Sequence, residues 1–247
     1  MRVLDLFAGL GGWSTPFAER GHEVVTVDND PRFGCTYTAD VLEWEPEDDF
    51  DIVLASPPCE KFSVLAFGKA WLPGYKPKHA GTELAIKLVR RTADLVDSIA
   101  PAFWVVENPV GMLRKLYLLP YERRMVTYCQ YGAPWRKPTD LWGGFPPSLE
   151  LHRPCRNGAP CHIRSPRGSR NGIQSDTNVE HKDEQVRAWY EAWGWGASTG
   201  SASEARREAV ALRAKIPEQL ALDVCLAAEC DLAAGCRAAD YTGRLFA

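Results

Sequence analysis

The sequence has little of what marks a membrane-bound or secreted protein. It holds no apolar run of about 18 residues, so we expect no transmembrane helix. A strand-like segment begins directly after Met1, without the pattern of a signal peptide. We therefore expect a cytoplasmic protein with no membrane partner. In a chain without a secretion signal, the eight cysteines indicate reduced thiols or metal ligands rather than a disulfide framework.

A strong excess of either charge is also lacking. The net charge of −3 gives no global basic field, so any surface that contacts nucleic acid must be local. The 247 residues fit one large domain, or one domain with a small insertion. An apolar content of 45% can supply the core of such a domain.

Strands alternate with helices through the first half of the chain. The hydrophobic pattern predicts a helix over residues 83–99, and strands over 3–7, 23–27, 51–55 and 102–106. This order predicts an α/β fold with a mostly parallel sheet and helices on both faces.

The character of the sequence changes at residue 143. Residues 143–178 are rich in Pro, Gly, Arg, Asn and Ser and show little periodicity, which predicts a small irregular insertion. Helical patterning returns afterwards, and Pro217 suits the first position of a final helix that extends to about residue 234.

A glycine-rich turn follows the first strand but lacks two common phosphate-binding signatures. No Gly-Lys-Ser/Thr follows Gly9-Leu10-Gly11-Gly12, and the spacing is not GxGxxG. A plain turn is one interpretation. Asp28 and Asp40 follow later and are either solvated acids or acceptors for ribose hydroxyls and an adenine amino group. Together these features suit a nucleoside cofactor without a pyrophosphate, such as S-adenosylmethionine.

The most informative stretch is Ser56-Pro57-Pro58-Cys59, directly after the buried strand at 51–55. The prolines end the strand and stiffen the loop that carries Cys59. Glu107 ends another strand of the same predicted sheet, so both side chains can face one cleft at its carboxyl edge. The alternatives are a structural cysteine and an ordinary turn.

A thiolate and a carboxyl group at one edge suit addition chemistry on a pyrimidine. Thiolate addition at carbon 6 of cytosine makes carbon 5 nucleophilic. A carboxyl group that protonates or hydrogen-bonds ring nitrogen 3 eases this addition. Loss of the carbon 5 proton and expulsion of the thiol then restore the ring.

Three motifs in this sequence resemble motifs I, IV and VI of the DNA (cytosine-5) methyltransferases. They are DLFAGLGGW at 5–13, SPPC at 56–59 with Phe62-Ser63 after it, and ENP at 107–109. The resemblance covers about residues 1–142 and resumes weakly at 216–220. It implies a Rossmann-like methyltransferase fold that uses S-adenosyl-L-methionine to methylate carbon 5 of cytosine in DNA.

The resemblance also implies roles for single residues. Cys59 would be the nucleophile and Glu107 the partner of the ring nitrogen. The cofactor site would be lined by Phe7, Ala8, Gly9, Leu10, Gly12, Asp28, Asn29, Asp40, Val41 and Pro58. The implied domains are a catalytic core at 1–142, a small target-recognition insertion at 143–200 and C-terminal helices at 201–247 that return to the core.

The sequence departs from the family pattern at several positions. Pro109 stands where the family usually carries Val, and Glu60 where it usually carries Gln. In the stretch 131–139, Lys137 falls at the place of the first family arginine and the second is absent. We expect Arg136 or Lys137 to approach the base or the catalytic cysteine, with a surface cation as the alternative. These departures leave the transferred group open.

We expect DNA as the macromolecular partner. A base inside a duplex must be flipped out, or presented on a single strand, before a thiol can reach it. Residues 151–172 contain no Asp or Glu, and a basic loop of this kind suits phosphate contacts unless it is simply solvated. Its arginines are Arg153, Arg156, Arg164, Arg167 and Arg170. So small a target-recognition region predicts a short recognition site in the DNA or help from a partner.

The same loop contains His152, Cys155, Cys161 and His162. Four candidate ligands could hold zinc in a segment with little core of its own. The spacing is not that of a standard zinc finger, and free thiols with surface histidines are the alternative. No metal is assigned from the sequence.

Two other functions are compatible with the residues. The same chemistry could act on RNA or with another alkyl donor, and a non-catalytic nucleic-acid-binding protein could retain the fold. We expect a monomer in a bacterial or phage-infected cell, with a restriction or recognition partner as an option. Restriction–modification and phage self-protection both fit the sequence.

Overall fold

The computed structural model describes residues 1–238 apart from 134, 157 and 163–213. The strands are β1 Arg2–Leu6, β2 Glu23–Asp28, β3 Tyr37–Thr38, β4 Ile52–Ala55, β5 Trp71–Leu72, β6 Lys76–Pro77, β7 Phe103–Pro109, β8 Glu122–Thr127 and β9 Pro138–Gly144. The α-helices are α1 Ser14–Glu19, α2 Phe67–Ala70, α3 Ala80–Ile99, α4 Leu113–Leu116 and α7 Glu218–Ala233. Short 3-10 helices cover Pro31–Phe33 (η1), Val64–Ala66 (η2), Pro73–Tyr75 (η3) and Tyr128–Tyr131 (η4).

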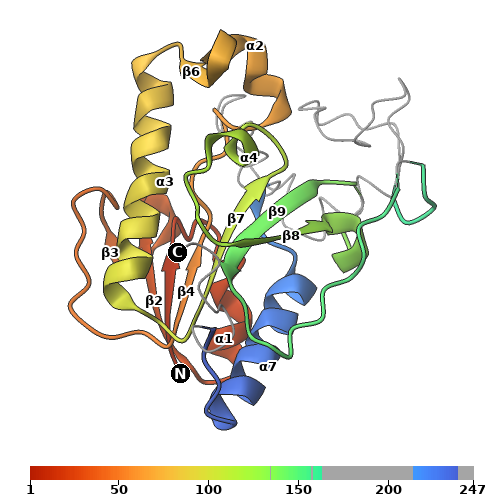
Figure 1. The fold of residues 1–247 in the computed structure, drawn as a ribbon. Coiled ribbons are helices and arrows are strands. Elements are labelled where there is room, and N and C mark those ends of the chain that lie inside the picture. Colours follow the sequence, from red (N-terminus) through yellow and green to blue (C-terminus); the bar gives the residue numbers. More distant parts are fainter. Residues whose placement is uncertain (134, 157, 163–213, 239–247) are drawn as a thin grey trace, which may run out of the picture.

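One seven-stranded sheet has the order β3-β2-β1-β4-β7-β9-β8 (Figure 1). The strands from β3 to β7 in this order are parallel, and β9 is antiparallel to both β7 and β8. The α/β class predicted from the sequence is confirmed, and the antiparallel β9 makes the sheet mixed near one edge.

Helices cover both faces of the sheet, with α3 on one face and α1 and α7 on the other (Figure 1). Because side chains alternate along a strand, β1 contributes to both layers. Val3 packs in the cluster that holds Phe17 of α1 and Leu220 of α7. Leu4 packs in the opposite cluster with Val89 of α3. Two buried cores therefore hold the strands of the sheet in place.

Most predicted elements have a counterpart in the structure. The strands predicted at 3–7, 23–27, 51–55 and 102–106 correspond to β1, β2, β4 and β7, and the helix predicted at 83–99 begins earlier, at Ala80. The final helix corresponds to α7. The elements expected between 163 and 213 lie outside the described residues.

Strands β8 and β9 were not predicted. The sequence of β8 is rich in charged residues, and β9 begins with Pro138 and ends in a glycine pair, all of which are depleted in strands. Strand β9 continues to Gly144, past the expected domain boundary after residue 142. Phe145 and Leu149 beyond it are also buried in the core.

No helix among the described residues is long and apolar enough to cross a bilayer. The buried acids include Asp5, whose side chain points to the face covered by α1. It is 1% exposed. Burial raises the pKa of this carboxyl group to about 7, although the nearby polar groups of Ser14 act in the opposite direction.

The buried carboxyl group predicts a pH dependence of stability. Since the folded protein keeps a proton that the unfolded chain loses above about pH 4, the free energy of unfolding should fall as the pH rises to about 7. Between about pH 5 and about pH 8, wild type should lose on the order of 2.5 kcal/mol more than Asp5→Asn. Urea denaturation at both pH values measures this difference.

The matched control for this experiment is Asp49→Asn, which changes an exposed acid. It should follow the wild-type pH profile. Parallel profiles for wild type and Asp5→Asn would show that Asp5 is charged in the folded protein.

Candidate active site

The loop after β4 carries Cys59 at the carboxyl edge of the sheet. Ser56 extends the strand pairing, because its N–H donates to the carbonyl of Leu6 at 3.1 Å. Its hydroxyl accepts from Nε1 of Trp13 in the glycine turn at 3.1 Å. The N–H groups of Phe62 and Ser63 both donate to the carbonyl of Cys59 at 3.0 Å. Cys59 is therefore held in a tight turn, with its side chain half-buried.

Glu107 lies near the end of β7, the strand that pairs with β4. The next residue, Asn108, is fully buried, and its side-chain amide donates to the carbonyl of Pro57 at 2.9 Å. A second connection forms further along, where the N–H of Met112 donates to the carbonyl of Phe62 at 2.6 Å. The structure thus brings the two predicted catalytic segments together on either side of Cys59.

Glu107 is 3% exposed, and its carboxyl group has two partners on neighbouring elements. The hydroxyl of Tyr128 donates to Oε1 at 2.8 Å, and Nζ of Lys137 lies 3.4 Å from the same oxygen. Lys137 also lies over the Tyr128 ring, 4.3 Å from its centroid. Both groups act on Oε1, so Oε2 is the oxygen that can face a ligand.

The charges around Cys59 oppose one another. Burial is the main cause that raises the pKa of its thiol, and Glu107 raises this pKa further. Lys137 lowers the pKa of the thiol, since a nearby positive charge favours the thiolate. Burial also raises the pKa of Tyr128 well above its ordinary value, so its hydroxyl stays protonated and donates.

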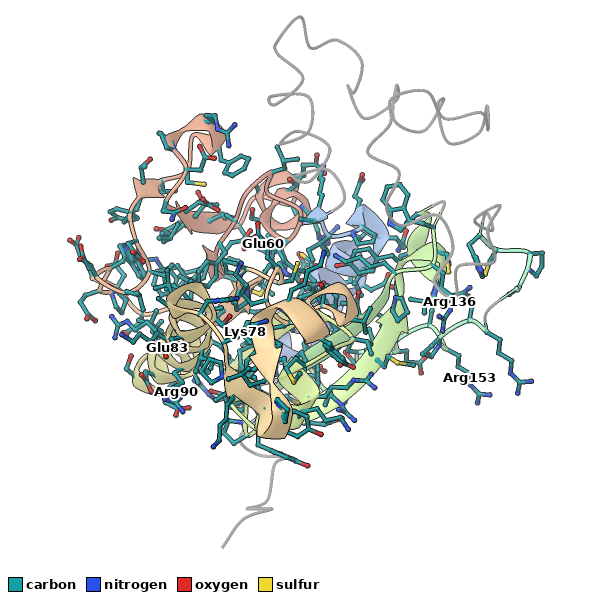
Figure 2. The ribbon with its side chains drawn as sticks, turned by 90° about the horizontal axis from the view of Figure 1, so that it is seen from above. Glu60, Lys78, Glu83, Arg90, Arg136 and Arg153 are labelled. Carbon is teal, nitrogen blue, oxygen red and sulfur yellow. The ribbon has the colours of Figure 1, made fainter. Side chains whose placement is uncertain are left out.

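The two cations considered for the site have different partners. Lys137 reaches Glu107, whereas Nε of Arg136 donates to the carbonyl of Cys155 at 3.2 Å. Figure 2 shows Arg136 on the same side of the molecule as Arg153, apart from Glu60, the residue after Cys59. The structure therefore places Lys137 at the site and directs Arg136 to the loop that begins the insertion.

A cavity of about 340 Å³ opens beside this edge of the sheet, between the glycine turn, the end of β2 and α3. Such a volume lies within the range of ligand pockets. All the predicted cofactor residues line it: Phe7, Ala8, Gly9, Leu10, Gly12, Asp28, Asn29, Asp40, Val41 and Pro58. Ser56 also lines it, so the Cys59 loop forms part of its wall.

The two acids in the cavity wall also organise the backbone. Asp28 accepts the N–H of Gly9 at 3.0 Å and the N–H of Asp30 at 2.9 Å, one on each carboxylate oxygen. Asp40 accepts the N–H of Leu42 at 3.0 Å through Oδ1. Because a carboxylate oxygen has more than one lone pair, both acids retain acceptor capacity toward a ligand.

The sequence left parts of this site unnamed. Leu84 and Leu88 of α3 and Ile216 line the cavity, although they lie far from the motifs in sequence. A Cβ on Gly12 would lie 2.6 Å from the backbone nitrogen of Ile216, so glycine allows this segment to close the wall. Tyr128 was also missed. Its sequence neighbourhood carries no signal, because its role depends on a contact with a distant strand.

Comparison with known proteins agrees with this arrangement. The model of the C-5 cytosine-specific DNA methylase family matches residues 1–118. A "Probable DNA (cytosine-5)-methyltransferase" of Frog virus 3 (isolate Goorha) is 37% identical over 152 residues, which cover 58% of this chain and 70% of that protein. The type II methyltransferase M.DdeI of Desulfomicrobium norvegicum is 30% identical over 130 residues, which cover 46% of this chain and 29% of that protein.

A solved structure described as a prophage-encoded DNA modification methyltransferase from E. coli has a TM-score of 0.43 and 21% identity. The match covers 58% of this chain and 46% of that one, so the chain spans less than half the length of this structure. The strand order described above begins with the 3-2-1-4 order of a Rossmann-like α/β sheet. The chain belongs to the C-5 cytosine-specific DNA methylase family.

The opposing charges around Cys59 predict opposite changes in its reactivity. Since the thiolate is the reacting form, iodoacetamide at about pH 8 should alkylate Cys59 about 3- to 10-fold more slowly in Lys137→Met. Glu107→Gln should react faster by a similar factor. Mass spectrometry of the peptide that carries Cys59 gives both rates.

The control for these rates is Lys69→Met, which removes an exposed cation of α2. Its rate should equal that of wild type. Equal rates in all four proteins would show that neither charge acts on the thiol.

Proposed function

We propose that this protein transfers a methyl group from S-adenosyl-L-methionine to carbon 5 of cytosine in DNA, through a covalent adduct with Cys59. The observation that carries this proposal is that the loop with Cys59 also forms part of the cavity wall. Ser56 and Pro58 line the cavity, and Cys59, which follows them, lies close enough to Glu107 for the carboxyl group to act on its thiol. A donor in the cavity and a ring held between Cys59 and Glu107 would therefore be neighbours.

The residues of the cavity fit S-adenosylmethionine. Its volume of about 340 Å³ suits a nucleoside with a short side chain. Asp28 and Asp40 offer acceptors for ribose hydroxyls and an exocyclic amino group, and Val41 and Leu84 offer apolar surface for a purine. When bound, this cofactor supplies the methyl group as a sulfonium substituent.

Cys59 begins the reaction on the base. Its thiol gives a proton to solvent, and the sulfur then forms a bond to carbon 6 while the carbon 5–carbon 6 π electrons move to carbon 5. Carbon 5 becomes the nucleophile that accepts the methyl group. Loss of the carbon 5 proton and cleavage of the sulfur–carbon 6 bond then regenerate cytosine's double bond and the free thiolate. Lys137 favours the thiolate form both before the attack on carbon 6 and when the thiolate is released.

Glu107 holds the opposite side of the ring. With Oε1 held by Tyr128 and Lys137, Oε2 can hydrogen-bond ring nitrogen 3 and the neighbouring amino group. Electron density that moves into the ring during thiolate attack is then stabilised at nitrogen 3. Tyr128 and Lys137 act as positioning residues for this carboxyl group, because they fix its orientation before a base arrives.

DNA is the proposed substrate, and its cytosine must leave the helical stack to reach both side chains. The described start of the insertion exposes Arg153 and Arg156, which suit phosphate contacts. Arg164, Arg167 and Arg170 lie outside the described residues.

A mechanism-based trap tests the covalent step. In DNA of random sequence that contains 5-fluorocytosine, fluorine cannot leave carbon 5 as a proton does, so the adduct should persist after methyl transfer. With S-adenosylmethionine present, wild type should form a denaturation-resistant complex whose cross-linked peptide contains Cys59. Cys59→Ser should form none, and Cys35→Ser, which changes a half-buried cysteine elsewhere, should behave as wild type.

Absence of an adduct with folded wild-type protein, or an adduct at another cysteine, would overturn the proposed mechanism. The same assay with 5-fluorocytosine in RNA separates the substrates. An adduct on RNA alone would assign the chemistry to RNA.

The hydrogen bond from Tyr128 to Glu107 predicts a kinetic effect. Tyr128→Phe should lower kcat about 10-fold, since the loss of one positioning hydrogen bond is worth about 1.4 kcal/mol. The KM for S-adenosylmethionine should stay unchanged, because Tyr128 does not line the cofactor cavity. Steady-state methyl transfer to DNA measures both constants.

Tyr121→Phe is the matched control, since the Tyr121 hydroxyl bonds Asp97 and the backbone of α3 instead. It should leave kcat unchanged. An unchanged kcat in Tyr128→Phe would remove Tyr128 from the positioning of Glu107.

A further inference from the structure

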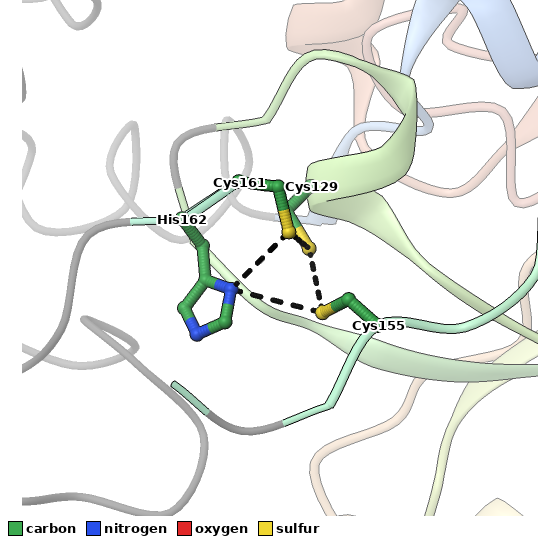
Figure 3. Close-up of side chains that lie close together, drawn as sticks. All are labelled: Cys129, Cys155, Cys161 and His162. Atoms are coloured by element: carbon green, nitrogen blue, oxygen red, sulfur yellow. Dashed lines mark hydrogen bonds between the residues drawn. The ribbon is translucent and has the colours of Figure 1, made fainter. Parts of the chain in front are cut away.

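We propose that Cys129, Cys155, Cys161 and His162 bind a structural zinc ion. Their four ligand atoms converge and all lie within 4.8 Å of one another (Figure 3). Sγ of Cys129 lies 3.2 Å from Sγ of Cys155 and 3.8 Å from Sγ of Cys161. Nδ1 of His162 lies 3.7 Å from Sγ of Cys155 and 3.6 Å from Sγ of Cys161.

These distances are close to those around tetrahedral zinc. Zinc bound at about 2.3 Å from sulfur and about 2.0 Å from nitrogen sets ligands about 3.8 Å apart for two sulfurs and about 3.5 Å apart for sulfur and nitrogen. Three of the four measured separations lie within about 0.2 Å of these values. The sulfurs of Cys129 and Cys155 need to move apart by about 0.6 Å to admit the ion.

The ligand set selects the metal and its role. Three thiolates and one imidazole in a tetrahedral arrangement are typical of zinc. Four protein ligands leave no position for water or substrate, so the ion is structural. Binding releases the three thiol protons to solvent, and His162 coordinates through Nδ1 with its ring proton on Nε2.

The membership of this cluster differs from the set suggested by the sequence. His152 is directed elsewhere, since its Nδ1 lies 2.8 Å from the carbonyl of Gln130 and its ring stacks on Tyr131. Cys129 takes the fourth position from η4, distant in sequence from the other three. The local spacing alone could not reveal this ligand, because the fold brings it in from another element.

Polar groups support the ligands. Nε2 of Gln130 donates to Sγ of Cys161 at 3.0 Å, and an N–H bond of this kind stabilises a metal-bound thiolate. The N–H of Cys155 donates to the hydroxyl of Thr127 at 3.0 Å, and its carbonyl accepts from Arg136. The ligand segment is therefore connected to β8 and to the loop before β9.

The ion would add to the hydrogen bonds that hold a segment without regular secondary structure. The described residues of 151–162 form no helix or strand, and Cys161 is exposed. Zinc would join this segment to η4, whose Tyr128 bonds Glu107. It would thus fix the start of the insertion against the wall of the active site. The inference needs only the four ligands, so it stands or fails separately from the proposed function.

Elemental analysis of the full-length protein tests the site. Wild type purified from zinc-supplemented cells without chelator should contain one zinc per chain. Cys161→Ser and His162→Ala should each contain at least 10-fold less. Two matched controls should keep their zinc, namely Cys230→Ser, which changes another exposed cysteine, and His152→Ala, which changes the neighbouring histidine.

Cobalt gives a readout that needs no variant. After zinc is removed from wild type with a chelator, Co²⁺ should restore a spectrum with thiolate-to-cobalt charge transfer and the strong visible bands of tetrahedral coordination. Gln130→Ala should weaken metal binding about 10- to 100-fold, as loss of a ligand's hydrogen-bond partner does. Because Gln130→Ala keeps all four ligands, it tests the site even if the ligand variants misfold.

Several outcomes would overturn the proposal. These are folded wild type with less than a tenth of a zinc per chain, iron in its place, or a Cys129–Cys155 disulfide detected by mass spectrometry under non-reducing conditions. Zinc that persists in both Cys161→Ser and His162→Ala would also place the metal elsewhere.

Discussion

The candidate active site depends on one buried hydrogen bond, from the side-chain amide of Asn108 to the carbonyl of Pro57. It joins the strand that carries Glu107 to the loop that carries Cys59, just past Ala55 and Val106, the last residues that pair between β4 and β7. Gly111 supports the same junction, since a Cβ there would lie 2.1 Å from the carbonyl oxygen of Phe62. A buried polar group without its partner is unfavourable by about 1–3 kcal/mol, so the loop has a strong preference for this position.

The remaining parts of the site build outward from that junction. On one side, Trp13 bonds Ser56 and ties the glycine turn, and with it the cofactor cavity, to the Cys59 loop. On the other side, Tyr128 and Lys137 reach Glu107 from the elements around β8 and β9. The antiparallel end of the sheet therefore supplies the groups that orient the acid, whereas the parallel part supplies the acid and the thiol.

The proposed zinc site involves the same elements around β8 and β9 that reach Glu107. Cys129 follows Tyr128 directly, and Arg136, next to Lys137, donates to the carbonyl of Cys155. The same two segments thus contact Glu107 on one side and the start of the insertion on the other. With the proposed zinc ion bound, the described start of the insertion would have a fixed position relative to Glu107.

Local pattern in the sequence was enough to predict the α/β class, the parallel strands β1, β2, β4 and β7, and the residues around the glycine turn. Short apolar runs, and the glycine and proline residues that end them, are local properties, so they can be read without the fold. The places of Cys59 and Glu107 at strand ends were predicted in the same way, whereas the roles proposed for them came from the resemblance to the family. Strands β8 and β9 escaped prediction, because their charged, proline and glycine residues are unfavourable in strands taken alone.

The sequence by itself determined which chemical groups end at the carboxyl edge of the sheet, since strand order and motif position place them there. Only the tertiary structure decided which cation approaches Glu107, that Tyr128 is its hydrogen-bond donor, and that Cys129 rather than His152 completes the sulfur cluster. Each of these depends on contacts between residues far apart in sequence. The physical reason is that such contacts are set by the packing of β8, η4 and β9 against β7, which no local pattern encodes.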